Sequence, residues 1–106
     1  MTHETKSGAV IDDRRTAKEV EQTIGYVVAT DRFMSGWGHA PGRSLFAVPF
    51  RNHTEAAIVE QNMRRRSEMI RVRVVGEDYR PKLYRGDHFS IRSMAECSRF
   101  FQEGGF

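Results

Sequence analysis

The chain has 106 residues, a net charge of +3 and 39% hydrophobic residues, as expected for one soluble globular domain. No apolar run approaches the ~20 residues that a membrane helix needs, and the N-terminal residues lack the apolar region of a secretory signal. A single cysteine, Cys97, excludes an internal disulfide, so we expect a cytoplasmic location. The four histidines are too far apart for a metal site, and no motif calls for a cofactor.

Three segments are predicted in the first third of the chain. Residues 1–11 are polar with little periodicity, and we expect them to form a flexible arm. Apolar residues at helical spacing then predict a short helix, which begins at Asp12 or Asp13 and ends at Gly25. The β-branched and aromatic residues of 26–30 predict the strand that follows.

The middle of the chain combines a glycine-rich run with the strongest helix signal. Residues 31–43 predict a long loop, and 44–50 predict a strand whose phenylalanine-bearing face meets the core. Pro49 lacks a backbone donor, so this strand should lie at an edge or leave the sheet there. The segment 52–68 predicts a helix, because Asn52 resembles an N-cap and apolar residues follow at helical spacing.

The last third predicts a strand over 69–75, a loop over 76–87, a strand over 88–92 and a short helix over 95–102. Side chains alternate between the two faces of a strand. In the first of these strands the apolar side chains should face the core and the arginines the opposite side, namely Ile70, Val72 and Val74 against Arg71 and Arg73.

This order of elements predicts a single α+β domain over residues 12–106. We expect a four-stranded, mostly antiparallel sheet with helices packed on one face. Ferredoxin-like packing is one arrangement that fits, although the sequence leaves the strand order and the oligomeric state open.

Basic residues concentrate between residues 60 and 92, a segment that contains nine basic groups and five acids. Eight of the nine are arginines, whose rigid fork of donors suits phosphate and carboxylate groups. The pattern favours an anionic partner, either nucleic acid or an acidic protein surface, and aromatic rings among the arginines would stack on exposed bases. The candidate contact residues in this half are Arg64, Arg65, Arg71, Arg73, Arg80, Lys82, Tyr84, Arg85 and Arg92.

Several of these groups also have a simpler explanation. Arginines at the end of a helix, such as Arg64 and Arg65, complement the helix dipole. Exposed arginines often serve only solvation, or they pair with nearby acids. If the last two strands are neighbours, however, one basic face is formed by Arg71, Arg73, His88 and Arg92.

The glycine-rich loop is a second candidate contact region. It would display Trp37, His39 and Arg43, and a tryptophan there would stack on a base or bind a protein partner. The loop lacks the third glycine of a dinucleotide-binding fingerprint and the lysine of a phosphate-binding loop. The alternative is that Trp37 folds back over the core.

No arrangement of residues indicates catalysis. The acid–base groups in loops or at strand ends are Asp31, His39, Asp87 and His88. They form no nucleophile–base constellation, and Cys97 is interpreted as a packed thiol close to two phenylalanines. We therefore expect a protein that is not an enzyme and has no catalytic residue.

The segments DRFMSGWGHAPGRS and RVRVV…YRPKLYRGDH, within residues 26–88, resemble small uncharacterised accessory proteins of phages and integrated mobile elements. The resemblance implies a role in handling nucleic acid or in blunting a host defence, as anti-CRISPR proteins do. It carries over no site residue.

Three functions from different classes are consistent with the sequence. The first is a non-enzymatic protein that contacts nucleic acid or a nucleoprotein complex through its arginine-rich surface, with an affinity that falls as salt rises. The second is an inhibitor that binds a host protein through residues 33–43, with an affinity that depends on Trp37 and Phe33 more than on salt. The third is a small enzyme.

Overall fold

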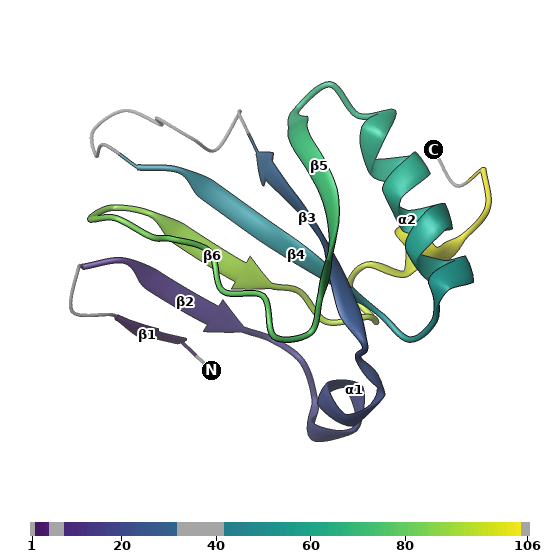
Figure 1. The fold of residues 1–106 in the computed structure, drawn as a ribbon, viewed down its shortest axis with the longest axis horizontal. Helices are drawn as coiled ribbons and strands as arrows, with labels where there is room; N and C mark the ends of the chain where they lie inside the picture. Colours follow the sequence, from purple (N-terminus) through teal and green to yellow (C-terminus); the bar gives the residue numbers. More distant parts are fainter. Residues whose placement is uncertain (1, 5–7, 32–41, 105–106) are drawn as a thin grey trace.

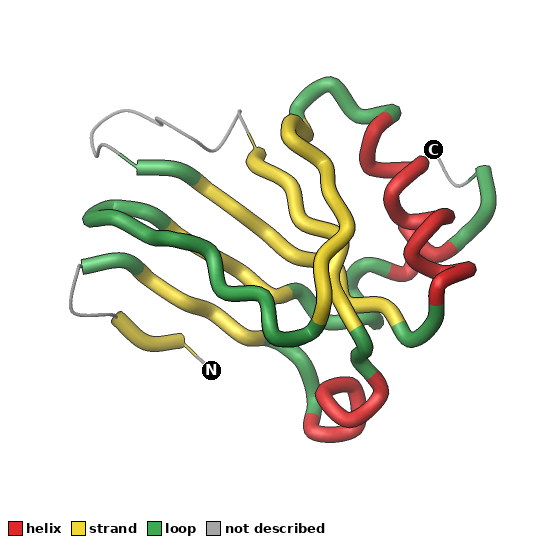
Figure 2. Tube along the Cα trace, viewed as in Figure 1, coloured by secondary structure: helices red, strands yellow, loops and turns green. Residues whose placement is uncertain are grey.

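The computed structural model describes residues 2–4, 8–31 and 42–104, and these ranges form one sheet with helices beside it (Figures 1 and 2). The strands are β1 (Thr2–Glu4), β2 (Val10–Asp13), β3 (Gly25–Asp31), β4 (Ser44–Phe50), β5 (Met69–Gly76) and β6 (His88–Ile91). The helices are α1 (Ala17–Gln22), α2 (His53–Arg64) and the 3₁₀ helix η1 (Ser98–Phe101). Across the described ranges no helix is long and apolar enough to cross a membrane.

The sheet is mixed, with the strand order β1-β2-β6-β4-β3-β5. β6 runs parallel to both of its neighbours, β2 and β4, whereas the other three pairings in the described sheet are antiparallel. The α+β class is confirmed, but the expectation of a four-stranded, mostly antiparallel sheet is wrong. The order also differs from ferredoxin-like packing, in which the first and third strands of a βαββαβ unit are neighbours, because β6 separates β2 from β4.

The segment expected to be an arm contributes to this sheet. β2 pairs with β6 from Val10 opposite His88 to Asp13 opposite Ile91, and β1 pairs with β2. β2 has only four residues, so its local β signal is weak, and its partner lies near the other end of the chain. The sheet therefore extends into the residues before position 12.

α1 begins later than predicted, because Asp12 and Asp13 belong to β2. Thr16 is the N-cap: its Oγ1 accepts a hydrogen bond from the Glu19 N–H (3.2 Å), and Glu19 Oε1 accepts one from the Thr16 N–H (3.0 Å). This reciprocal pair is a capping box. No residue of α1 is buried, so the six-residue helix links β2 to β3 without covering the sheet.

β4 is central in the sheet and is buried on both faces. Phe46, Val48 and Phe50 pack on the face that α2 and η1 cover, so the predicted core face is confirmed. Pairing with β6 ends at Ala47, so Pro49 lies where the described sheet continues only on the β3 side. This position matches the prediction that the proline would lie where the sheet ends, since it has no N–H to donate.

The opposite face of the sheet is covered by the loop that joins β5 to β6, residues 77–87. Figure 2 shows this loop running back along β6. Tyr79 and Leu83 of the loop pack on a second apolar cluster. The buried members of that cluster are Tyr26, Val28, Leu45, Ala47, Phe89 and Ile91. α2 and η1 therefore pack on one face, and a loop without helix or strand closes the other.

α2 begins as predicted but ends earlier. Asn52 is its N-cap and accepts a hydrogen bond from the Glu55 N–H (2.9 Å). The Glu55 carboxylate binds the backbone and side chain of Arg51 in place of the Asn52 backbone, so an ion pair replaces the second half of the capping box. The helix ends at Arg64, and the short helix predicted over 95–102 is reduced to η1.

β5 is an edge strand, and its register with β3 shifts around Arg71, which has φ +57°. Val72 is buried under α2 as predicted. Ile70 and Val74 are 36% and 44% exposed, so the expectation that the core covers them is wrong, although Val74 pairs with Val27 on the face that α2 covers. The alternation is interrupted by the bulge, and an edge strand has less of its surface covered.

Candidate nucleic-acid interface

The loop 77–87 is held at its end by Asp87, which is only 3% exposed. Its carboxylate accepts hydrogen bonds from the Arg43 N–H (2.9 Å), the Arg43 guanidinium (2.8 Å) and the Tyr84 N–H (2.9 Å). Burial by itself would raise the pKa of Asp87, but these hydrogen bonds outweigh it and hold the pKa below its ordinary value. The charged carboxylate thus joins the start of β4 to the end of the loop.

Two glycines allow the backbones to cross closely beside Asp87. A Cβ atom on Gly42 would clash with the carbonyl group of Gly86, and Gly86 itself has φ +86°. Glycine suits both positions, because Gly42 needs room for the close approach and Gly86 needs the positive φ. The His88 N–H also donates to the Arg43 carbonyl oxygen (2.8 Å), so the crossing places Arg43 against the loop.

Tyr84 is the most exposed large apolar side chain among the described residues, at 55%. The Arg43 guanidinium carbon lies 5.8 Å from the centroid of the Tyr84 ring, and Lys82 Nζ lies 5.6 Å from it. Arg43 Nη2 also donates to the Lys82 carbonyl oxygen (2.9 Å), which holds the two cations near each other. Each cation–π contact at an exposed site contributes about 0.5–1 kcal/mol.

A second aromatic and basic group lies at the start of the loop. Arg73 Nη2 donates to the Tyr79 hydroxyl oxygen (2.8 Å), and the guanidinium carbon lies 5.7 Å from the centroid of that ring. Arg80 is exposed, and its Nη1 donates to the Tyr79 carbonyl oxygen (2.8 Å). The tyrosine thus holds Arg73 on the face of the sheet that the loop covers.

Six sequence candidates therefore lie on the loop or contact it. We call them the loop surface, and they are Arg43, Arg73, Arg80, Lys82, Tyr84 and Arg85. Three acids belong to the same segment, Glu77, Asp78 and Asp87, and the last is buried. Cations exceed acids here, so the loop surface has the sign of charge that attracts phosphate.

The arginines of α2 lie apart from this surface. Arg64 pairs with Glu60 (2.8 Å) and donates to the carbonyl oxygen of Val72 (2.9 Å). Arg65 follows as the C-cap residue of the helix. Both belong to the layer that covers the other face of the sheet, and Arg64 has a structural role there.

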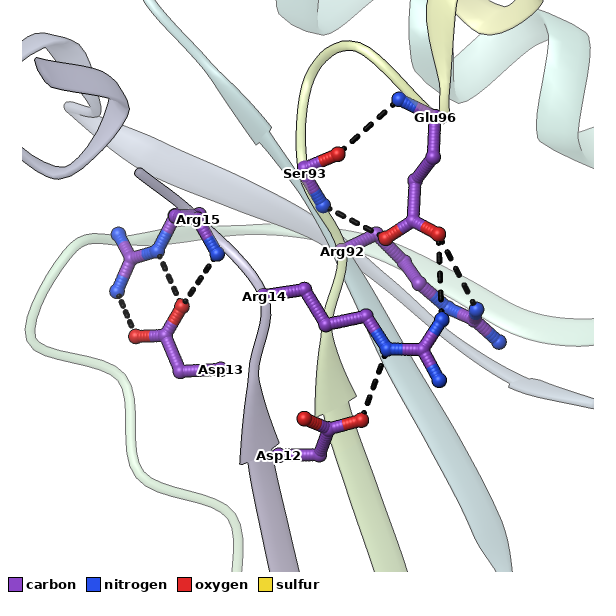
Figure 3. A network of polar contacts seen from close by, with 7 residues as sticks. All are labelled: Asp12, Asp13, Arg14, Arg15, Arg92, Ser93 and Glu96. Atoms are coloured by element: carbon purple, nitrogen blue, oxygen red, sulfur yellow. Dashed lines mark hydrogen bonds and ion pairs between the residues drawn. The ribbon is translucent and has the colours of Figure 1, made fainter. Parts of the chain in front are cut away.

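A basic face of Arg71, Arg73, His88 and Arg92 required the last two strands to be neighbours, and it does not form because β3 and β4 separate β5 from β6. Arg92 lies over the ring of Phe46, with its guanidinium carbon 6.0 Å from the centroid, on the face that α2 covers. It also pairs with Glu96 (3.7 Å), which is the centre of the network in Figure 3.

Two candidates lie outside the described residues. Trp37 and His39 belong to the segment 32–41, so their roles stay predictions. Arg43, the third candidate of the glycine-rich loop, is described and belongs to the loop surface.

A pocket of about 460 Å³ lies between the loop and the sheet. Its lining includes Arg15 and Tyr26, which the sequence reasoning missed. Arg15 is paired with Asp13, and Figure 3 shows this pair separately from the network around Glu96. The run DDRR at 12–15 was an available signal, because it places each arginine two residues after an aspartate with which it can pair, as Arg15 does with Asp13.

Two of the groups considered for catalysis, Asp87 and Cys97, are buried, and His39 lies outside the described residues. Asp87 is committed to hydrogen bonds within the loop. Burial raises the pKa of the Cys97 thiol to about 12, so it is a packed side chain, as the sequence indicated. Within the described part of the chain, histidine, cysteine and acidic residues form no group of three or more that could hold a metal ion.

Comparison of the chain with protein-family models, curated proteins and solved structures finds no match. The resemblance to accessory proteins of phages and mobile elements therefore stays a prediction. The function has to be inferred from the residues and their geometry.

Proposed function

We propose that the chain binds single-stranded nucleic acid through the loop surface. The observation that carries the proposal is the exposed Tyr84 ring, with the cations of Arg43 and Lys82 at 5.8 and 5.6 Å from its centroid. Proteins that bind single strands combine such rings, on which bases stack, with cations that follow the phosphates. Arg80 and Arg85 extend the positive charge along the same loop, and Arg73 of β5 adds to it beside Tyr79.

A single strand suits this surface better than a duplex does. Stacking on Tyr84 requires a base that is not already stacked and paired, and a single strand offers it without a further cost. The cations of the loop also lie on a short irregular segment. A flexible single-stranded backbone can adapt to such a segment more readily than the regular groove of a duplex can. We therefore expect single strands of DNA or RNA to bind more tightly than duplexes of equal length.

The two other functions have no comparable support. The protein-binding inhibitor depends on residues 33–43, most of which lie outside the described residues. The small enzyme would need a nucleophile beside a base, and the described acid–base groups do not supply this arrangement.

Fluorescence anisotropy with labelled single strands tests the proposal, in a series between about 50 and 200 mM salt. The test variant is Lys82→Gln with Arg85→Gln, because both cations are exposed and the described residues give them no ion pair. For single strands the slope of log K against log salt is about −0.7 per neutralised phosphate, so two lost contacts should make it shallower by about 1.4.

The matched control is Arg65→Gln with Arg99→Gln. This pair removes the same charge from exposed positions on α2 and η1, on the other side of the sheet. The control should keep the wild-type slope. If neither single strand nor duplex binds at low salt, or if both variants lose affinity equally, the loop surface is not the nucleic-acid site.

A further inference from the structure

The pocket beneath the loop has the size and walls of a ligand site. Its volume of about 460 Å³ lies within the 300–1,000 Å³ that small-molecule sites occupy. The floor is the sheet, with Ile11 from β2, Tyr26 from β3 and Phe89 from β6. The roof is the loop itself, with Tyr79 and Leu83.

Three of the residues that line the pocket are aromatic. The rings of Tyr79 and Phe89 meet edge to face, with centroids 6.5 Å apart and an interplanar angle of 68°. Tyr26 lines the same pocket from β3, so rings from three different elements border one space. Such walls favour a planar aromatic group, which packs against rings in offset or edge-to-face geometry.

A polar pair closes one side of the pocket. Arg15 Nε lies 3.0 Å from Asp13 Oδ1, and Arg15 Nη2 lies 2.7 Å from Asp13 Oδ2, as Figure 3 shows. The Arg15 side chain is only 8% exposed, and its guanidinium carbon lies 5.3 Å from the centroid of the Tyr26 ring. The pair is therefore held in place before any ligand arrives.

This pair offers hydrogen-bond donors and acceptors that complement those on the edge of a nucleobase. A guanidinium has five N–H donors, of which Asp13 engages those on Nε and Nη2, and a carboxylate has several acceptor positions. Burial by itself would raise the pKa of Asp13, but hydrogen bonds from the Arg15 side chain and backbone outweigh it, so the carboxylate is charged at neutral pH.

Positive charge lies at the mouth of the same pocket. Arg80 is both exposed and part of the lining, and Tyr79, which forms part of the roof, holds Arg73 through its hydroxyl group (2.8 Å). Arginine forks bind phosphate in a two-point geometry that lysine cannot reproduce. Aromatic walls, a polar pair and a cationic mouth thus occur in one site.

We propose that the pocket binds one nucleotide, with its base among Tyr26, Tyr79 and Phe89 and its phosphate toward Arg80 and Arg73. The base edge meets the Asp13–Arg15 pair. The nucleotide belongs either to the bound single strand, in which case this inference rests on the proposed function, or to a free mononucleotide of the same chemistry.

Nuclear magnetic resonance on the ¹⁵N-labelled wild-type protein tests the inference directly. Adenosine, guanosine, cytidine and uridine monophosphates are titrated in turn, with ribose 5-phosphate and inorganic phosphate as probes that lack a base. We expect saturable shifts for at least one mononucleotide at the amides of Ile11, Tyr26 and Phe89 and at the Arg15 side chain. The two probes without a base should leave the floor of the pocket unshifted.

The variant Leu83→Trp fills the pocket from its roof, where Leu83 is half-buried. It should weaken mononucleotide binding at least about tenfold. Val74→Trp is the matched control, because Val74 is exposed and lies two residues from Val72, on the face that α2 covers. If Leu83→Trp does not fold, Ile11→Phe narrows the pocket from the sheet.

The outcomes separate this inference from the proposed function. If mononucleotides bind in the pocket and single strands do not bind, the inference stands and the proposed function fails. If neither Leu83→Trp nor Ile11→Phe weakens strand binding and no mononucleotide shifts the floor of the pocket, the inference is overturned and the loop surface alone binds the strand. If a filled pocket weakens strand binding about tenfold and free mononucleotides do not bind, the nucleotide comes from the strand.

Discussion

Arg43 and Asp87 lie 44 residues apart in the chain and form an ion pair with 2.8 Å between Arg43 Nη2 and Asp87 Oδ2. The Arg43 N–H donates to the other oxygen of the same carboxylate at 2.9 Å. Through these two bonds the start of β4 holds the end of the loop 77–87. The geometry of the loop surface therefore depends on a buried acid as much as on its exposed cations.

Replacing Asp87 by alanine should lower the free energy of unfolding by about 2 kcal/mol, because the substitution leaves partly buried donors of Arg43 and Tyr84 without their buried acceptor. Urea unfolding measures the change. Glu77→Ala, at an exposed position of the same loop, is the control and should stay within about 0.5 kcal/mol of the wild type. Equal losses in the two variants would contradict the structural role of Asp87.

The same carboxylates predict how stability depends on pH. The pKa values of Asp87 and Asp13 are lower in the folded chain than their ordinary value of 3.8, so the unfolded chain binds more protons in the acid range. Their contribution is fully present above the unfolded pKa and is lost as the pH falls through the folded pKa.

Urea unfolding from pH 7 down to about pH 2 measures this loss. The Asp87→Asn variant should be less stable than the wild type at pH 7, and its stability should fall less steeply below about pH 4. Parallel curves for the two proteins would show that Asp87 has the same pKa in both states.

Gly25 lies where β3 passes between two neighbours, and it should not tolerate a side chain. A Cβ atom there would lie 2.5 Å from the Val75 carbonyl oxygen and 2.6 Å from Phe50 Cζ. Gly25→Ala should therefore cost about 1–3 kcal/mol of stability, as overpacking of a core does. In Gly76→Ala the nearest atom is Oδ1 of Asp78 at 3.3 Å, on a side chain at the surface, so that variant is the control. Thermal unfolding measures both variants, and equal melting temperatures would contradict the packing argument.

Arg71 occupies a backbone conformation that glycine adopts at less cost. Its φ of +57° lies in the left-handed region, where a side chain costs about 1–2 kcal/mol. Arg71→Gly should therefore keep or raise stability, whereas Arg71→Val, with a β-branched side chain, should lower it. Urea unfolding distinguishes the two, and a glycine variant as unstable as the valine variant would argue against this conformation.

Cys97 should resist thiol reagents until the chain unfolds. Burial raises its pKa from 9.0 to about 12, which lowers the thiolate fraction at neutral pH about a thousandfold. The measurement is the rate of reaction with a chromogenic disulfide, in buffer and in denaturing urea. Rapid reaction of the native protein would show that the thiol is accessible.

Elements whose signals are local could be predicted from the sequence. α2 begins after Asn52 because that side chain caps its first turn, and an apolar stripe follows within the same helix. The bounds of β4 also agree with the prediction, since alternating apolar and aromatic residues indicate a strand and the proline marks where its pairing ends on one side. The α+β class followed from such elements without knowledge of how they pair.

Pairings and sites between distant segments were decided only by the tertiary structure. β2 has four residues and becomes a strand because β6 lies beside it in parallel, a contact that no local pattern records. β3 and β4 lie between β5 and β6, so the arginines of β5 do not share a face with Arg92, as they would if the last two strands were neighbours. The same packing brings Arg15 and Tyr26 under the loop, because burying the apolar face of the sheet requires the loop to fold back over it.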